Sequence, residues 1–162
     1  MAAACIAVLV GPIWLAVAAI LPPDQAEMEE CFQEDAADLK LVARYLSGLD
    51  YSYISIDEDR LEEGLMLTDA GIQYQKIENA SAMEALDRLL GWGDYNCVTK
   101  SEQTIVFEKW DYAGKDRGIA YTIREGAKPK VQFLIHSEPL SESGWYYYEA
   151  CYEEYRTRNE LW

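Results

Sequence analysis

Between residues 95 and 136 the chain alternates apolar and polar side chains, and this alternation restricts the possible fold more than any other pattern. Four short runs share it, namely Tyr95–Thr99, Thr104–Trp110, Gly118–Arg124 and Lys130–His136. Turn-forming residues separate these runs. A period of two is typical of half-buried strands, and short connections favour antiparallel neighbours. The sequence therefore predicts an antiparallel meander of four strands.

The alternation also predicts which side chains share a face of this sheet. The buried face would carry Ile105, Phe107, Ile119, Tyr121, Ile123, Val131, Phe133 and Ile135. The opposite face would carry Thr104, Glu108, Thr122, Arg124 and Gln132. We therefore expect one face of the sheet to contact helices and the other to contact water.

Two helices are expected before the meander. After Pro22-Pro23, apolar residues recur with helical spacing at Met28, Phe32, Leu39, Val42, Ala43 and Leu46, and Gly48 would end this helix. Ser81 and Glu84 have the spacing of a capping box, which predicts the start of a second helix that ends at Gly91.

The region between these helices is expected to hold short strands. Residues 51–56 are rich in aromatic and β-branched side chains and predict a strand, and residues 57–60 read as a polar loop. Residues 65–67 and 72–77 could form two more strands. The chain is thus predicted to be an α+β protein, with an antiparallel meander of about four to six strands packed on two or three helices.

A shift of 44 positions aligns residues 44–55 with residues 88–99, and it matches Arg, Leu, Asp and Tyr. Each segment reads as the end of a helix, a tight turn and a strand. A duplicated helix-strand unit would explain the match. The alternative is that any helix that ends in a tight turn before a strand selects similar residues.

Residues 1–23, MAAACIAVLVGPIWLAVAAILPP, contain no charged side chain. As a helix rising 1.5 Å per residue, this segment would be about 34 Å long, enough to cross a bilayer. Because no Lys or Arg precedes the apolar run, we expect either that the natural start lies upstream of Met1 or that this sequence has been shortened at its N-terminus. We predict a membrane anchor or uncleaved signal segment over 1–23 and one acidic extracytoplasmic domain over 24–162.

The orientation follows from the residues after the apolar segment. Residues 24–30 include acidic side chains and no basic one, so nothing there holds the chain in the cytoplasm. We therefore predict a single-pass protein of the cell membrane with its C-terminal domain outside. The alternative is secretion after signal cleavage near Ala18, because residues 16–18 have the small-x-small form that signal peptidase accepts.

The charge of the chain excludes some partners. There are 29 Asp and Glu residues against 14 Lys and Arg, a formal net charge of −15, and every charged side chain lies at or after Asp24. Such a field repels nucleic-acid backbones and anionic lipid headgroups. We expect no nucleic-acid partner, whereas a cationic partner remains open.

The sequence assigns no catalytic residue, metal ligand or cofactor. His136 is the single histidine, which excludes a metal site built on two histidines. The acidic run at residues 57–63 lacks the spacing of a calcium loop. Cys97 with His136 as a thiol nucleophile is the one specific enzyme alternative. Cys31, Cys97 and Cys151 allow at most one internal disulfide, and three unpaired thiols are the other interpretation.

Residues 143–155, SGWYYYEACYEEY, are the most aromatic segment of the chain. A helical stripe is formed by Trp145, Tyr148, Tyr152 and Tyr155, which predicts a short aromatic entry and then a helix over residues 148–158. Strand spacing fits the first few residues equally well. The candidate binding surface consists of Tyr146, Tyr147 and Tyr155.

These patterns favour a membrane-tethered extracytoplasmic domain that binds a protein, peptide or envelope component without catalysis. Its general composition is similar to that of exported bacterial proteins of unassigned activity. One alternative is an inhibitor or immunity-type protein whose acidic surface covers a cationic partner. Another is an envelope hydrolase that uses carboxylates or Cys97 with His136.

Overall fold

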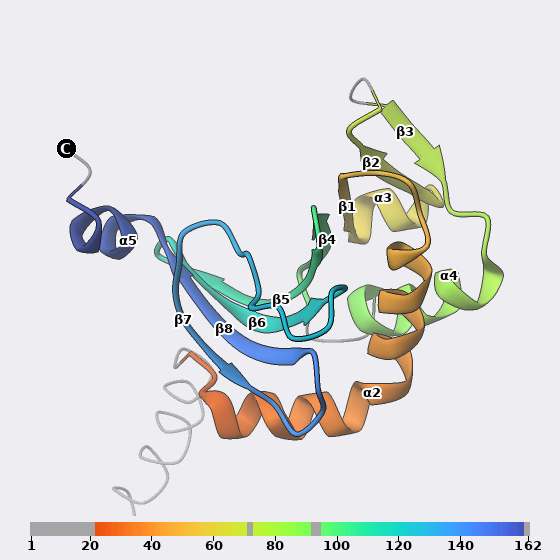
Figure 1. Cartoon of the computed structure of the whole chain (residues 1–162). Coiled ribbons are helices and arrows are strands. Elements are labelled where there is room, and N and C mark those ends of the chain that lie inside the picture. Colours follow the sequence, from red (N-terminus) through yellow and green to blue (C-terminus); the bar gives the residue numbers. More distant parts are fainter. Residues whose placement is uncertain (1–21, 71–72, 92–94, 161–162) are drawn as a thin grey trace, which may run out of the picture.

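The computed structural model describes residues 22–70, 73–91 and 95–160, which form an eight-stranded antiparallel sheet and four α-helices (Figure 1). The strand order across the sheet is β3-β2-β1-β4-β5-β6-β8-β7. The predicted α+β class is confirmed, but the sheet has more strands than expected. The sheet is curved, and α2 runs across one of its faces.

Helix α2 (Gln25–Ser47) begins and ends where its sequence predicts. Asp24 caps its first turn by accepting hydrogen bonds from the backbone N–H groups of Ala26 and Glu27. Its buried positions are the predicted ones, Met28, Phe32, Leu39, Val42, Ala43 and Leu46. Each large side chain buried here stabilises the fold by about 1.5–3 kcal/mol. The long apolar stripe therefore fixes α2 against the sheet.

The first half of the sheet comes from the segment after α2. Strand β1 (Tyr53–Asp57) pairs with β2 (Leu65–Thr68), and β2 pairs with β3 (Gln73–Lys76) at the edge of the sheet. The polar loop expected at residues 57–60 is instead the start of helix α3 (Glu58–Glu62). The physical reason is a helix cap, because the Asp57 carboxylate accepts the backbone N–H of Arg60.

Helix α4 (Ala80–Leu86) continues into a π-helical turn η1 (Asp87–Gly91). The expected helix is present, but its cap is Asn79 and not Ser81. The Asn79 side-chain oxygen accepts the backbone N–H of Ala82 at 2.9 Å, so the helix starts before the predicted capping box.

The second half of the sheet is not the predicted meander. Strands β4 (Cys97–Ser101), β5 (Thr104–Tyr112) and β6 (Lys115–Thr122) follow one another as expected. Strand β8 (Trp145–Cys151) then lies between β6 and β7 (Leu134–Pro139). Its side chains are largely buried on both faces, which suits an inner strand, whereas the more polar β7 lies at the edge.

The prediction of a helix over residues 148–158 is wrong for its first four residues, because they belong to strand β8. The chain stays extended through Cys151, and only α5 (Tyr152–Arg158) is helical. Aromatic residues favour strands when both faces can be buried. Trp145 and Tyr147 join the main core on the α2 side, and Tyr148 packs on the opposite face.

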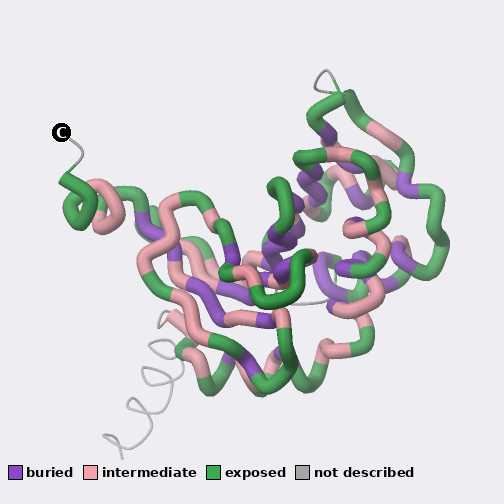
Figure 2. The backbone as a smooth tube through the Cα atoms, in the orientation of Figure 1, coloured by how far each residue is buried: buried purple, intermediate pink, exposed green. Residues whose placement is uncertain are grey.

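The face of the sheet opposite α2 carries a second, smaller core. Val106, Ala120, Tyr148 and Ala150 are buried there, and Val131 and Leu134 pack against them. Figure 2 shows that buried residues lie along the central strands of the sheet as well as on α2. The expectation of a fully solvent-facing side is therefore wrong, because the segment after β6 covers part of it. Thr104 and Thr122, predicted to contact water, are buried.

Two further expectations concern the cysteines and the membrane. Among the described residues, Cys31, Cys97 and Cys151 form no disulfide. The predicted membrane segment lies almost wholly outside the described residues. Within the described parts of the chain, no helix is long and apolar enough to span a membrane.

Candidate binding site beside strand β3

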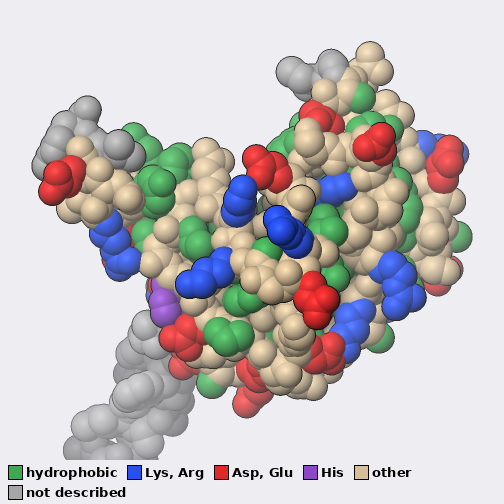
Figure 3. Space-filling model, in the orientation of Figure 1, with side chains coloured by type: hydrophobic (Ala, Val, Ile, Leu, Met, Phe, Trp, Pro, Cys, Tyr) green, Lys and Arg blue, Asp and Glu red, His purple; other side chains and the backbone are tan. Residues whose placement is uncertain are grey.

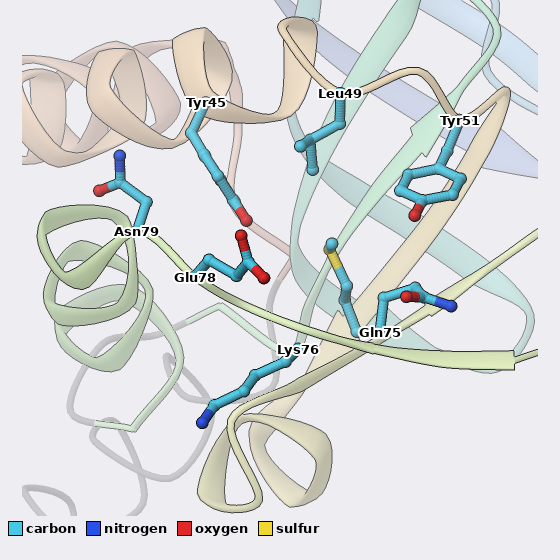
Figure 4. Close-up of a pocket in the computed structure, with 8 residues that line it drawn as sticks. Tyr45, Leu49, Tyr51, Gln75, Lys76, Glu78 and Asn79 are labelled. Atoms are coloured by element: carbon cyan, nitrogen blue, oxygen red, sulfur yellow. The ribbon is translucent and has the colours of Figure 1, made fainter.

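A cavity of about 500 Å³ lies where the C-terminal end of α2, strand β3 and the start of α4 meet (Figure 4). The wall nearest to α2 consists of Tyr45, Leu49 and Tyr51. The opposite wall consists of Met66, Gln75, Lys76, Glu78 and Asn79, with Met66 beside Gln75 in the sheet. One side of the cavity is therefore mainly aromatic and apolar, and the other is mainly polar.

The end of α2 determines the position of the first wall. The backbone N–H of Gly48 donates to the carbonyls of Arg44 and Tyr45, and the chain then leaves the helix. Leu49 and Tyr51 follow this turn and pack at the margin of the main core. Tyr45 belongs to the last turn of α2 itself. The last turn of α2 and the segment that follows it thus bring Tyr45, Leu49 and Tyr51 to one cavity.

The polar wall follows strand β3. Ile77 is buried in the main core, which holds the chain down just before Glu78 and Asn79. Asn79 is held by its role as the cap of α4. In Figure 4, the phenol oxygen of Tyr45 and the carboxylate of Glu78 point toward one another. The cavity therefore has a hydrogen-bonding pole at this end.

The chemistry of this pole follows from the pKa of Tyr45. Burial raises the pKa of its phenol above the usual value, a backbone hydrogen bond from Glu78 lowers it, and the Glu78 charge raises it. The phenol is therefore protonated at neutral pH and can donate a hydrogen bond. With Gln75 and Asn79, the cavity offers both donors and acceptors beside an apolar wall. Such a combination is typical of a ligand pocket.

Strand β3 lies at the edge of the sheet and has mostly exposed side chains. The backbone N–H of Ile77 donates to the Gly64 carbonyl, so this opposing pair is hydrogen-bonded. In an antiparallel ladder, hydrogen-bonded and non-hydrogen-bonded pairs alternate. Met66 and Gln75 lie two positions further along the two strands, so they are also a hydrogen-bonded pair. The N–H and C=O groups of Tyr74 and Lys76, on either side of Gln75, therefore point away from β2. Within the described parts of the chain, no other segment bonds to these backbone groups, so they form an open row of donors and acceptors.

The structure does not bring the three predicted tyrosines together. Tyr146 and Tyr147 are on opposite faces of β8, and Tyr155 is on α5. Tyr147 is buried, and the Tyr146 hydroxyl donates to the Ala127 carbonyl at 3.1 Å. The ring of Tyr155 packs edge-on against Phe133. Ligand contact by any of these rings stays a prediction.

Cys97 and His136 are also far apart. They lie on β4 and β7, which are separated by β5, β6 and β8, so four strand spacings give a distance of about 19 Å. Burial and nearby carboxylates raise the pKa of Cys97 to about 12, which keeps the thiol protonated. His136 lies 3.2 Å from the Glu138 carboxylate. The two side chains therefore do not form a nucleophile–base pair in this structure.

Among the described residues, no group of three or more His, Cys, Asp or Glu side chains is arranged to hold a metal ion. Comparisons of the chain with protein-family models, curated protein sequences and solved structures find no match. The functional proposal therefore rests on the geometry of the cavity and the neighbouring strand.

Proposed function

We propose that the chain is a membrane-tethered, extracytoplasmic binding domain that holds an extended peptide segment of an envelope protein at strand β3. The observation that carries the proposal is the position of the open edge of β3 beside the aromatic cavity. A peptide strand would pair with the outward backbone groups of Tyr74 and Lys76. One of its side chains would enter the cavity between Tyr45 and Tyr51.

The two parts of this site have different tasks. Main-chain hydrogen bonds to an edge strand supply affinity for almost any extended peptide. Selectivity comes from the cavity, whose apolar wall and polar pole favour a large side chain with a polar end. An open edge also invites aggregation unless something covers it, so a bound segment would protect the protein as well.

The membrane tether is part of the same proposal. Residues 1–23 are uncharged, whereas the domain after them is strongly acidic. An uncharged segment of this length is suited to a bilayer. The duplicated helix-strand unit stays a proposal too, and it is supported by the direct antiparallel pairing of β1 with β4, the strands that follow the two compared helices.

Photocrosslinking in intact cells tests the peptide site. Tyr74 is replaced in the full chain by a photoreactive benzophenone amino acid, and the matched control carries it at Tyr112, which is equally exposed but lies on β5. We expect a specific crosslinked partner from position 74 and none from position 112. The same partner from both positions, or none from position 74, would contradict the proposal.

A substitution at Lys76 distinguishes a partner that forms backbone hydrogen bonds with β3 from one that only touches its side chains. In the photoreactive protein, Lys76→Pro removes a backbone N–H that points away from β2, so the native ladder keeps its hydrogen bonds. Lys76→Ala is the control, because it removes the same side chain and keeps the N–H. We expect Lys76→Pro to reduce the crosslink yield at least about tenfold relative to Lys76→Ala. Equal yields would show that the partner does not pair with the strand.

A second candidate function, masking of a cationic partner, is favoured by Glu108 and Asp116. Both carboxyls have a raised pKa, first because they are partly buried and then because neighbouring acids such as Asp111 repel a further charge. A lysine or arginine of a partner would relieve this repulsion. A crosslinked partner that contacts β5 and β6, and not β3, would favour this candidate.

A further inference from the structure

A second cavity, of about 510 Å³, lies between the β4–β5 turn and the segment that follows β6. Its lining includes Arg124, Lys128 and Lys130 but a single carboxylate, Glu102. This local excess of positive charge contrasts with a chain whose formal net charge is −15. Figure 3 shows Lys and Arg side chains gathered in the middle of the visible face, with acidic side chains around them.

The segment that carries these cations is attached to the sheet at several points. The backbone N–H of Ile123 donates to the Gln103 carbonyl at 2.8 Å, and that of Lys130 donates to the Thr104 hydroxyl at 2.9 Å. The Tyr146 hydroxyl holds the middle of the segment through the Ala127 carbonyl. The backbone that presents the cations is therefore fixed, which reduces the entropic cost of binding a ligand there.

Of the three cations, one has a carboxylate partner among the described residues. Lys130 lies 3.2 Å from Glu102, and both side chains are largely exposed. Arg88 and Arg117 elsewhere in the chain form ion pairs. Within the described residues, by contrast, no ion pair with Arg124 or Lys128 is present. The three cations outnumber the single carboxylate in this cavity and repel one another, and a bound anion would reduce that repulsion.

We propose that this cavity binds a phosphate group. A guanidinium can bind a phosphate with two parallel hydrogen bonds, so Arg124 would orient the ligand, and Lys128 would add a point charge. Lys130 can exchange its exposed contact with Glu102 for a phosphate oxygen. Three cations against one carboxylate match a doubly charged anion better than a single carboxylate group. The site is separate from the cavity beside β3.

Titration of the full chain in detergent with inorganic phosphate, followed by NMR, tests this site. We expect saturable shifts of the backbone amides of Lys128 and Lys130, and no such shifts with chloride at the same ionic strength. A second titration with glycerol 1-phosphate distinguishes a free phosphate from one carried on an organic group. Tighter binding of the ester would place the natural ligand among phosphate esters, and weaker binding would favour the free ion.

The variant Arg124→Ala/Lys128→Ala should weaken phosphate binding at least about tenfold, because the charge-assisted hydrogen bonds are lost. The control Lys115→Ala/Arg158→Ala changes the net charge equally at exposed positions outside both cavities. It should change the affinity less than about twofold. Equal weakening by both pairs would show only a general charge effect and would overturn the proposal. So would unchanged binding by the first pair when its circular dichroism spectrum is native.

Discussion

At the scale of single residues, the buried Lys100 connects the sheet with the candidate site. Its ammonium group donates to the carbonyls of Leu46 and Leu49 at 3.1 and 2.6 Å, at the C-terminal end of α2. A cation at this end of a helix satisfies carbonyls that have no partner within the helix. Because Leu49 also lines the cavity beside β3, Lys100 holds one wall of the site in place.

Replacement of Lys100 by Met keeps most of the apolar side chain but removes the ammonium donor to the Leu49 carbonyl and one of the donors to the Leu46 carbonyl. We expect the free energy of unfolding to fall by about 1–3 kcal/mol. Urea denaturation of the full chain measures this change. Lys115→Met, at an exposed position, is the control and should change stability by less than about 0.5 kcal/mol. A loss no larger than that of the control would show that the buried ammonium contributes little.

The negative charges of Glu108 and Asp116 destabilise the folded state. Burial, and then nearby carboxylates, raise the pKa of both groups in the folded state, so these two groups hold their protons to higher pH in the folded protein than in the unfolded chain. Their contribution to stability therefore falls as the pH rises from the usual carboxyl range through the raised pKa values. We expect Glu108→Gln to increase the thermal midpoint at pH 7, and the gain to disappear near pH 4. A gain of the same size from Glu125→Gln, on the exposed loop, would argue against this cause.

At the scale of elements, the sequence predicts α2 well and β8 poorly for one physical reason. An amphipathic helix with a single buried face has an apolar period that can be read directly from the residues. In β8, Tyr147 and Tyr148 are buried on opposite faces, so the alternation disappears and helical spacing fits equally well. Tertiary contacts with β6 and β7, and not local preference, decide its structure.

The pairing of β5 with β6 gives a prediction for one glycine. The register shifts between Glu108 and Trp110, and a Cβ atom added at Gly118 would lie 2.1 Å from the Phe107 carbonyl oxygen. We expect Gly118→Ala to lower the free energy of unfolding by about 1–3 kcal/mol, because backbone atoms must move. The control is Gly48→Ala, where the nearest atom is 3.5 Å away. Thermal unfolding that is similar for both variants would show that the bulge can shift at little cost.

The candidate site illustrates what a sequence without structure does not reveal. Tyr45 is recognisable as helical and Tyr51 as the entry to a strand, but their common cavity depends on where β3 and α4 pack. The edge position of β3 depends on the order of all the strands. The polar character of residues 73–76 is the one signal that could have suggested an edge strand.

At the scale of the whole molecule, the two proposed sites have different chemistry. The cavity beside β3 combines an aromatic wall with an open strand edge, whereas the second cavity gathers the cations of the segment after β6. Neither cavity contains the tyrosines that the sequence had suggested. The positions of both proposed sites therefore depend on strand order, which the aromatic content of residues 143–155 did not indicate.

Residue-resolved amide hydrogen exchange on the full chain, alone and in complex with its captured partner, tests whether a peptide strand adds to β3. We expect the amides of Tyr74 and Lys76 to exchange rapidly in the free protein, whereas that of Gln75 is protected by its hydrogen bond to β2. In the complex, Tyr74 and Lys76 should become protected. Protection of these two amides in the free protein, or unchanged exchange in the complex, would contradict strand addition at β3.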